Sequence, residues 1–376
     1  MNEINQNHRA ILQSIAHRAM LERGLLPDFS PEALVELGRL RSPAVSDTSL
    51  IYPDHAVRDM RNLLWCSIDN DDSLDLDQLT VAEAANSGKV KVLVAIADVV
   101  SSILKGSAID RHAQTNTTSV YTAAEIFPML PEKLSTDLTS LNYNQDRLAM
   151  VIEMVVGVDG TLEDAGIHPA WVRNHAKLAY NSVAAWLEKN ADMPEAIRAV
   201  PGLADNLQLQ DQAAQRLKNY RHAQGALSLD TIEAKPVFDG DQIRALEFDE
   251  RNRAKEIIED FMIAANGVTA RFLSSRHFPT IRRVVRVPKR WERIVAIAAE
   301  HHYTLPDEPN SKALEDFLVS QKTVDPLRFP DLSLAVIKLL GTGEYVAELP
   351  DGEVPGHFGL EGRGLGRMAR PNPPLS

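Results

Sequence analysis

Residues 67–78 read S-I-D-N-D-D-S-L-D-L-D-Q, and their aspartates directly follow an apolar stretch, residues 63–68, whose composition predicts a strand. Five aspartates fall within nine residues here: Asp69, Asp71, Asp72, Asp75 and Asp77. Carboxylates packed this densely repel one another, and a divalent cation relieves the repulsion. Oxygen ligands without histidine or thiol are those that Mg²⁺ and Mn²⁺ prefer. The stretch therefore predicts a site for Mg²⁺, with Mn²⁺ as an alternative, and argues against zinc.

The aspartates also have other interpretations. A calcium-binding EF-hand loop needs Gly at its position 6 and Glu at its position 12. Counted from Asp69, these positions hold Leu74 and Thr80, so the loop does not fit. A phosphotransferase D-x-D motif would be residues 75–77, but it should follow its strand at once, and residues 70–73 intervene. A solvated acidic turn without any ligand stays open as an alternative.

The rest of the chain mixes strands and helices without regular βαβ alternation, which predicts an α+β fold. Strands are expected at 63–68, 90–100, 148–158 and 280–287, and helices at 8–23, from Pro31 onward, 176–190, 205–222, 253–274 and 289–302. Residues 105–147 look rich in loops. We therefore divide the chain into a small N-terminal helical segment (1–55), a main domain (56–360) and an irregular tail (361–376).

Composition is that of a globular protein, with 44% hydrophobic and 24% charged residues among 376. No apolar run approaches the ~18–20 residues that span a bilayer, so no membrane association is expected. The first nine residues lack the apolar core of a signal peptide. A single cysteine, Cys66, excludes an intrachain disulfide. We expect a cytoplasmic protein, and the sequence does not indicate an oligomeric state.

Charge is distributed unevenly along the chain. The net charge of −12 disfavours binding to nucleic acids, because contacts to phosphates dominate such affinities. Yet eight basic residues stand between positions 271 and 293 against one acid: Arg271, Arg276, Arg282, Arg283, Arg286, Lys289, Arg290 and Arg293. This basic stripe on an acidic body fits a protein that binds a polyanion at one site. A solvated charged face is the alternative.

Beyond these patterns, the sequence resembles the RNB catalytic domain of the ribonuclease II/R family over about residues 60–360. The family motif I-D-x-x-x-x-x-D-x-D-D is matched by Ile68-Asp69, Asp75 and Asp77, with Gln78 in its last place. Further matches are Ile96–Val99, Thr118–Tyr121, Pro128–Pro131, Asp146–Leu148, Arg251–Ala254 and Ile258–Asn266.

The resemblance implies a 3′→5′ exoribonuclease that uses Mg²⁺ to hydrolyse single-stranded RNA to nucleoside 5′-monophosphates. Asp69, Asp75 and Asp77 match the residues that hold the metal and the scissile phosphate, and Gln78 joins them as a possible ligand. The RNA contacts that it implies are Tyr121 as a stacking ring, Tyr180 in the RNA channel, Phe238 as a second ring, and Glu259 and Asn266 on one helix face. Arg283 and Arg286 of the basic stripe complete the set of expected RNA contacts.

Two departures from the family pattern matter. Gln78 replaces a fourth aspartate and removes one negative charge from the cluster. The family also continues into an arginine-bearing loop, whereas residues 361–376 are rich in Gly, Arg and Pro. Residues 370–376 can be encoded so that the frame one nucleotide later reads A-P-(I or T)-R-R-Y-P-D, which predicts a truncated or frameshifted member with impaired turnover. Loss of that segment should leave Phe261 or Phe272 exposed.

Alternative functions follow from the same residues. One is a catalytically inactive RNA-binding module of the same fold, and the other is a metal phosphohydrolase that acts on small substrates. Ordinary core packing is the alternative for Tyr121, and an interhelix hydrogen bond is the alternative for Asn266.

Overall fold

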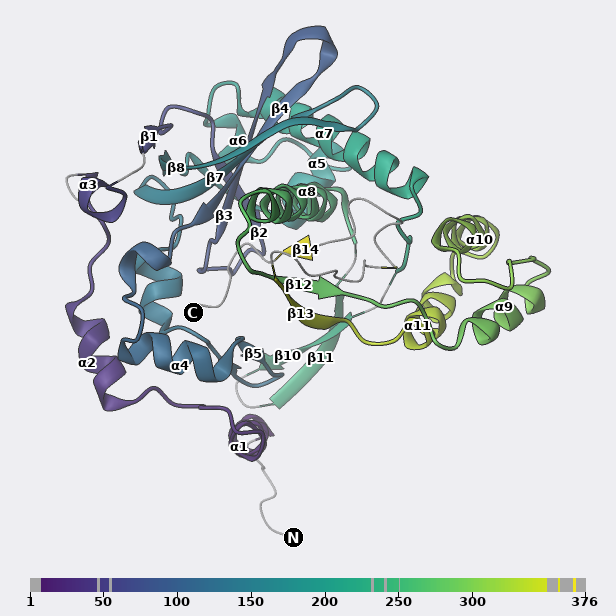
Figure 1. Cartoon of the computed structure of the whole chain (residues 1–376), viewed down its shortest axis with the longest axis horizontal. Coiled ribbons are helices and arrows are strands. Elements are labelled where there is room, and N and C mark those ends of the chain that lie inside the picture. Colours follow the sequence, from purple (N-terminus) through teal and green to yellow (C-terminus); the bar gives the residue numbers. More distant parts are fainter. Residues whose placement is uncertain are drawn as a thin grey trace.

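The structure is a computed structural model that describes residues 8–45, 48–53, 56–230, 233–239, 242–249, 251–349, 358 and 368–369. At its centre is a seven-stranded sheet in the order β1-β8-β7-β4-β3-β2-β9 (Figure 1). Its strands are β1 (Arg58–Asp59), β2 (Cys66–Asp69), β3 (Gln78–Ala84), β4 (Val90–Ala97), β7 (Asp146–Val156), β8 (Leu162–Arg173) and β9 (Ala176–Ala179). Neighbouring strands are antiparallel except the edge pairs β1/β8 and β2/β9, which are parallel. The predicted α+β fold is confirmed.

Two long helices, α7 (Leu203–Ala223) and α8 (Arg253–Ser275), cover one face of the sheet (Figure 1). Their apolar sides pack on alternate residues of β4 and β7, such as Val92 and Ile152, because side chains of a strand point to opposite faces in turn. Phe261 of α8 is fully buried in this core. The predicted exposure of Phe261 is therefore wrong, since its side of α8 faces the sheet.

The edge formed by β2 and β9 carries two shorter helices, α5 (Tyr180–Leu187) and α6 (Glu195–Arg198). The helix predicted over 176–190 is wrong at its start, because residues 176–179 pair with β2 as a strand. The stretch 105–147 holds more structure than predicted. It contains α4 (Ala108–Asn116), the hairpin of β5 (Val120–Tyr121) and β6 (Ile126–Phe127), and a π-helical segment (Lys133–Leu138). Short 3-10 turns lie at Asn86–Gly88 and Val100–Ser102.

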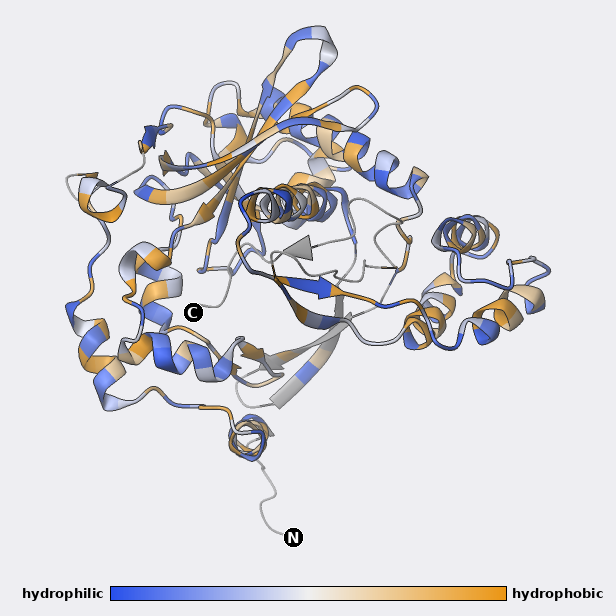
Figure 2. Cartoon of the chain, viewed as in Figure 1, coloured by the Kyte–Doolittle hydropathy of each residue, from blue (hydrophilic) through white to orange (hydrophobic). Residues whose placement is uncertain are grey.

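Three helices form a separate layer beside the sheet: α9 (Trp291–Glu300), α10 (Ser311–Val324) and α11 (Phe329–Leu340) (Figure 1). They share a core built around Trp291, Phe317 and Val336. Figure 2 shows hydrophilic and hydrophobic residues on each of these helices, as expected where one side is buried. The strands β12 (Thr280–Val284), β13 (Glu344–Glu348) and β14 (Met368–Ala369) form a three-stranded sheet near the centre of the view in Figure 1. The hairpin of β10 (Glu233–Asp239) and β11 (Gln242–Asp249) lies below them in that view.

The N-terminal segment is helical, as predicted, with α1 (His8–Glu22), α2 (Pro31–Arg39) and α3 (Thr48–Ile51). The Ser30 hydroxyl accepts a hydrogen bond from the Ala33 N–H at 3.2 Å, which caps α2. Ala33 is buried against Ile109 of α4, so the segment packs on the main body. The boundary at residue 55 stays a prediction. Within the described residues, no helix is long and apolar enough to cross a membrane.

Candidate active site

The aspartate cluster occupies a loop between two neighbouring strands. β2 ends at Asp69 and β3 begins at Gln78, and these strands are antiparallel neighbours, so the loop stands at one end of the sheet. The Asp77 carbonyl accepts a hydrogen bond from the Ala97 N–H at 2.9 Å, which ties the loop to β4. Asp71 and Asp72 are both exposed, as expected for residues that point to solvent.

The carboxylates of this loop act on one another electrostatically. Asp77 is accessible to solvent, but protein atoms crowd its carboxyl and reduce its hydration. This desolvation, together with the negative charges of Asp69 and Asp75, raises the pKa of Asp77 to about 6. No basic side chain contributes to this shift among the described residues. The three aspartates therefore form one acidic group without a neutralising partner at Asp77.

Among the described residues, no group of three or more Asp, Glu, His or Cys side chains is placed to hold a metal ion. Asp69 Oδ1 instead accepts hydrogen bonds from the Asn70 N–H at 2.7 Å and the Ser73 hydroxyl at 2.9 Å. Asp69 Oδ1 thus stabilises its own loop, and the assignment of Asp69, Asp75 and Asp77 as metal ligands stays a prediction. The donor chemistry, carboxylates and the Gln78 amide, fits a hard divalent cation.

Tyr121 lies next to this acidic group. Its side chain is 70% exposed, and the residue forms the end of β5. Partial burial of its hydroxyl and the negative charges of Asp75 and Asp77 raise the pKa of Tyr121. An exposed ring does not match core packing, and the role of Tyr121 as a stacking residue stays a prediction.

Tyr180 reaches the same end of the sheet from β9. It follows Ala179, which pairs with Asp69 in the ladder of β9 and β2. The ring is half-buried, and Lys255 Nζ of α8 lies 6.0 Å from its centre. Strand register thus brings the Tyr180 backbone close to the aspartate loop.

The two residues expected on one face of α8 differ in environment. Glu259 is exposed, and its carboxylate accepts a hydrogen bond from Arg251 Nη2 at 2.6 Å. Asn266 is buried, and within the described residues its Oδ1 has no hydrogen-bond partner. A buried acceptor without a partner is uncommon in folded proteins. Asn266 therefore keeps an unused ligand atom, whereas Glu259 is held by an ion pair.

The basic stripe is only partly available. Arg282 is buried, and its guanidinium pairs with Glu348, so it is wrongly included in an exposed stripe. Arg283 is exposed, and Arg286 is exposed while paired with Glu344. Phe238 belongs to β10, but its side chain lies outside the described residues, as does the tail 361–376 apart from Met368 and Ala369.

Comparison with known proteins places this geometry in a family. The family model described as "RNB domain" matches residues 57–363. The chain belongs to the RNB domain family. Its strands β1–β9, the aspartate loop and α8 all fall inside the matched range.

Relatives of this RNB chain are named as ribonucleases. Ribonuclease R of Escherichia coli is 33% identical over 308 residues, which cover 80% of this chain and 36% of the relative. Ribonuclease R of Vibrio parahaemolyticus is 35% identical over 231 residues, which cover 61% of this chain and 27% of the relative. The chain thus spans about a third of the length of these proteins.

Solved structures share the RNB fold. Mycoplasma genitalium RNase R in complex with ribose methylated single-stranded RNA superposes with a TM-score of 0.84 at 22% identity, covering 97% of this chain and 54% of the other. Yeast Ssd1, described as a pseudonuclease, superposes with a TM-score of 0.64 at 13% identity, covering 85% of this chain and 38% of the other.

One basic residue beside the aspartate loop could not be predicted from the sequence. Lys177 of β9 donates a hydrogen bond from its Nζ to the Ser73 carbonyl at 2.6 Å, so a cation is fixed to the aspartate loop. The contact joins residues 104 positions apart, and local spacing carries no signal for it. Only the pairing of β9 with β2, which was predicted as helix, would have placed Lys177 there.

Proposed function

We propose that this chain is a 3′→5′ exoribonuclease that hydrolyses single-stranded RNA to nucleoside 5′-monophosphates with a divalent cation, Mg²⁺ or Mn²⁺. The observation that carries the proposal is the acidic group of Asp69, Asp75 and Asp77 beside the exposed ring of Tyr121. Relatives that are 33% and 35% identical to it over the aligned residues are named ribonuclease R, although the chain spans only part of their length.

The aspartates supply the negative charge that a cation site requires. A bound divalent cation would activate water and stabilise the leaving 3′ oxygen. Asp77 suits this role because its pKa of about 6 leaves it mostly ionised at neutral pH, and no basic side chain in the described part of the chain contributes to that pKa. Asp69 would exchange its hydrogen bonds from Asn70 and Ser73 for the cation. Gln78, buried at the start of β3, offers an amide oxygen but no charge.

Aromatic rings beside the aspartates would hold the end of the RNA. Stacking of a base on a ring contributes ~1–3 kcal/mol and accepts any base, which gives binding without sequence preference. Tyr121, whose hydroxyl feels the charges of Asp75 and Asp77, would stack the nucleotide nearest the aspartates. Tyr180, which follows the strand that pairs with Asp69, would contact the RNA further along. We assign the remaining contacts to Phe238, Glu259, Asn266, Arg283 and Arg286.

A second candidate is an inactive RNA-binding module. Gln78 removes one negative charge from the cluster, and the fold is shared with a protein described as a pseudonuclease. Fold alone does not decide between the two, because function depends on the site.

One gel experiment separates these functions. RNA labelled at its 5′ end is incubated with the chain, with Mg²⁺ or with a chelator. Progressive shortening from the 3′ end that requires Mg²⁺ supports the exoribonuclease, and a mobility shift without shortening supports the binding module. If neither occurs but a small phosphodiester is hydrolysed, the chain is a phosphohydrolase and the RNA proposal is wrong.

A further inference from the structure

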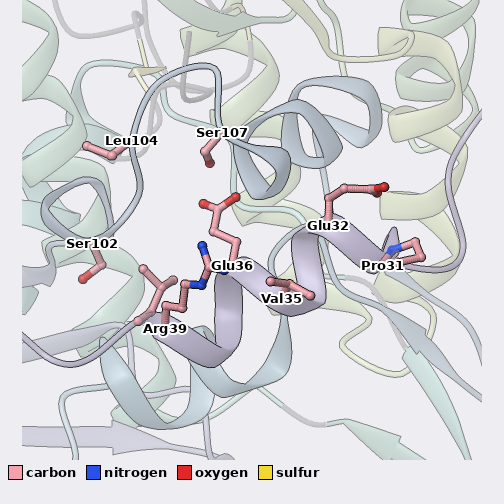
Figure 3. Close-up of a pocket in the computed structure, with 9 residues that line it drawn as sticks. Pro31, Glu32, Val35, Glu36, Arg39, Ser102, Leu104 and Ser107 are labelled. Atoms are coloured by element: carbon pink, nitrogen blue, oxygen red, sulfur yellow. The ribbon is translucent and has the colours of Figure 1, made fainter.

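The N-terminal helices hold the start of α4. Glu36 of α2 points toward this helix (Figure 3), and its Oε2 accepts hydrogen bonds from the N–H groups of Ala108 at 2.8 Å and Ile109 at 3.2 Å. The first N–H groups of a helix have no partner inside it, and a negative charge there is favourable. A residue from outside the matched RNB range thus completes the N-terminus of α4.

The connection between α1 and α2 holds the other end of α4. Asn116, only 1% exposed, accepts a hydrogen bond from the Leu26 N–H at 2.8 Å and donates one to the Leu26 carbonyl at 2.8 Å. One turn earlier, the ring of His112 stacks on Phe29 with 4.0 Å between ring centres. Both polar groups of a buried amide are therefore committed to the N-terminal segment.

α4 leads directly to Tyr121. Thr117 ends the helix with a left-handed conformation, φ 56°, and β5 begins three residues later. Opposite Val120 of β5 lies Phe127 of β6, which is buried and meets the His17 ring of α1 edge-on at 6.5 Å between centres. The Tyr121 ring itself is mostly exposed, so its position depends on the backbone of this hairpin.

From these contacts we infer that α1 and α2 form a brace that positions Tyr121, by holding both ends of α4 and the β5–β6 hairpin. The inference rests on the proposed role of Tyr121 in RNA binding. Asn116 and Glu36 are positioning residues that act through α4: they bond to backbone groups of Leu26, Ala108 and Ile109. Asn116 Nδ2 also lies 3.1 Å from Nε2 of His112 on the same helix. If α1 and α2 form this brace, a substitution that loosens α4 should move Tyr121 and leave the aspartate loop unchanged.

The test compares Asn116→Ala with its neighbour Thr115→Ala in the full chain. Thr115 is exposed, and its hydroxyl bonds only to the Arg111 carbonyl of the same helix, so it is a matched control. Glu36→Gln is a second, milder variant in case Asn116→Ala fails to fold. Hydrogen exchange of residues 117–127 reports on the hairpin, and fluorescence anisotropy reports on affinity for a short single-stranded RNA in a chelator.

Asn116→Ala is expected to speed exchange in residues 117–127 and to weaken RNA binding by about threefold or more, whereas Tyr121→Ala weakens it by about tenfold. Because both act through the same ring, the double variant should bind no more weakly than Tyr121→Ala alone. The brace would be overturned if hydrogen exchange in residues 117–127 were unchanged in Asn116→Ala and Glu36→Gln. It would also be overturned if the double variant lost RNA affinity by the product of the two single losses. If Tyr121→Ala itself binds RNA normally, the proposed stacking role fails, and hydrogen exchange alone then decides whether the brace exists.

Discussion

At the scale of single residues, the charge on Asp77 is the feature that links structure to chemistry. Its pKa is raised to about 6 by desolvation and by the charges of Asp69 and Asp75. A nearby cation would therefore favour the ionised form of this carboxyl. The sequence predicted the cluster because five aspartates in nine residues need no tertiary information to be seen. It could not predict that Asp69 bonds to Asn70 and Ser73, because that depends on the exact turn.

Asp77 should titrate at an unusually high pH in the chain without divalent cations. Carboxyl-carbon NMR should give a midpoint near pH 6, well above the usual value of 3.8. Asp75→Asn should lower this midpoint, because it removes a negative charge that disfavours ionisation of Asp77, and Mg²⁺ should lower it as well. Asp164→Asn, which changes an aspartate of β8 outside the loop, is the control. A titration midpoint near pH 4 that is the same in the wild type and in Asp75→Asn would show that the carboxyls do not interact.

At the scale of elements, the long helices and central strands could be predicted, but the edges could not. α8 and β4 have clear periodic patterns, and their observed bounds lie within a few residues of those expected. β8 was missed because Gly166 and Pro169 interrupt its pattern, although both residues pair with β7. β9 was predicted as helix because A-K-L-A suits a helix locally, and pairing with β2 overrides that propensity.

The contact between α7 and α8 provides a test with a defined pH dependence. Arg221 pairs with the buried Asp260, whose pKa is nevertheless raised to about 6, chiefly by desolvation. Arg221→Met should cost ~3–5 kcal/mol of unfolding free energy at pH 8, because it leaves a buried charge unpaired. The loss should be smaller at pH 5, where Asp260 can keep its proton.

The direction of this pH dependence follows from the difference in bound protons between the folded and unfolded states. A carboxyl whose pKa is raised in the folded state holds a proton that the unfolded state releases, so its contribution to stability falls as pH rises from 3.8 through about 6. Lys218→Met, which breaks the more exposed pair with Glu256 between the same helices, should cost only ~0–1 kcal/mol. Urea unfolding at the two pH values measures both variants, and a pH-independent loss for Arg221→Met would contradict the account.

Adjacent arginines of β12 should give opposite phenotypes. Arg283 is exposed and is proposed to contact RNA phosphates, whereas Arg282 is buried and paired with Glu348. Arg283→Ala should weaken RNA binding and reduce the salt dependence by about 0.7 in the log–log slope, with little change in stability. Arg282→Ala should instead cost ~3–5 kcal/mol of stability, because it leaves Glu348 buried and unpaired. Anisotropy titrations over a salt series and urea unfolding distinguish them, and equal salt slopes for Arg283→Ala and the wild type would remove Arg283 from the RNA site.

At the scale of the whole molecule, long-range contacts decide what the N-terminal helices do. The sequence predicted α1 and α2 from their periodicity and capping residues, but it gave no sign of where they dock. The Leu26–Asn116 contact joins residues 90 positions apart, and the Glu36–Ala108 contact joins residues 72 apart. Such pairings depend on the folded chain, so the aspartates could be found from sequence while the elements that position Tyr121 could not.

Release of mononucleotides from RNA tests the proposed hydrolysis at the aspartate loop. Release of nucleoside 5′-monophosphates from a single-stranded RNA with Mg²⁺ is followed by chromatography for the wild type and for Asp77→Asn. The substitution removes the charge but little volume, so turnover should fall by about 100-fold or more while RNA affinity stays unchanged. Equal release by both proteins, or no release by the wild type despite full RNA binding, would contradict the claim.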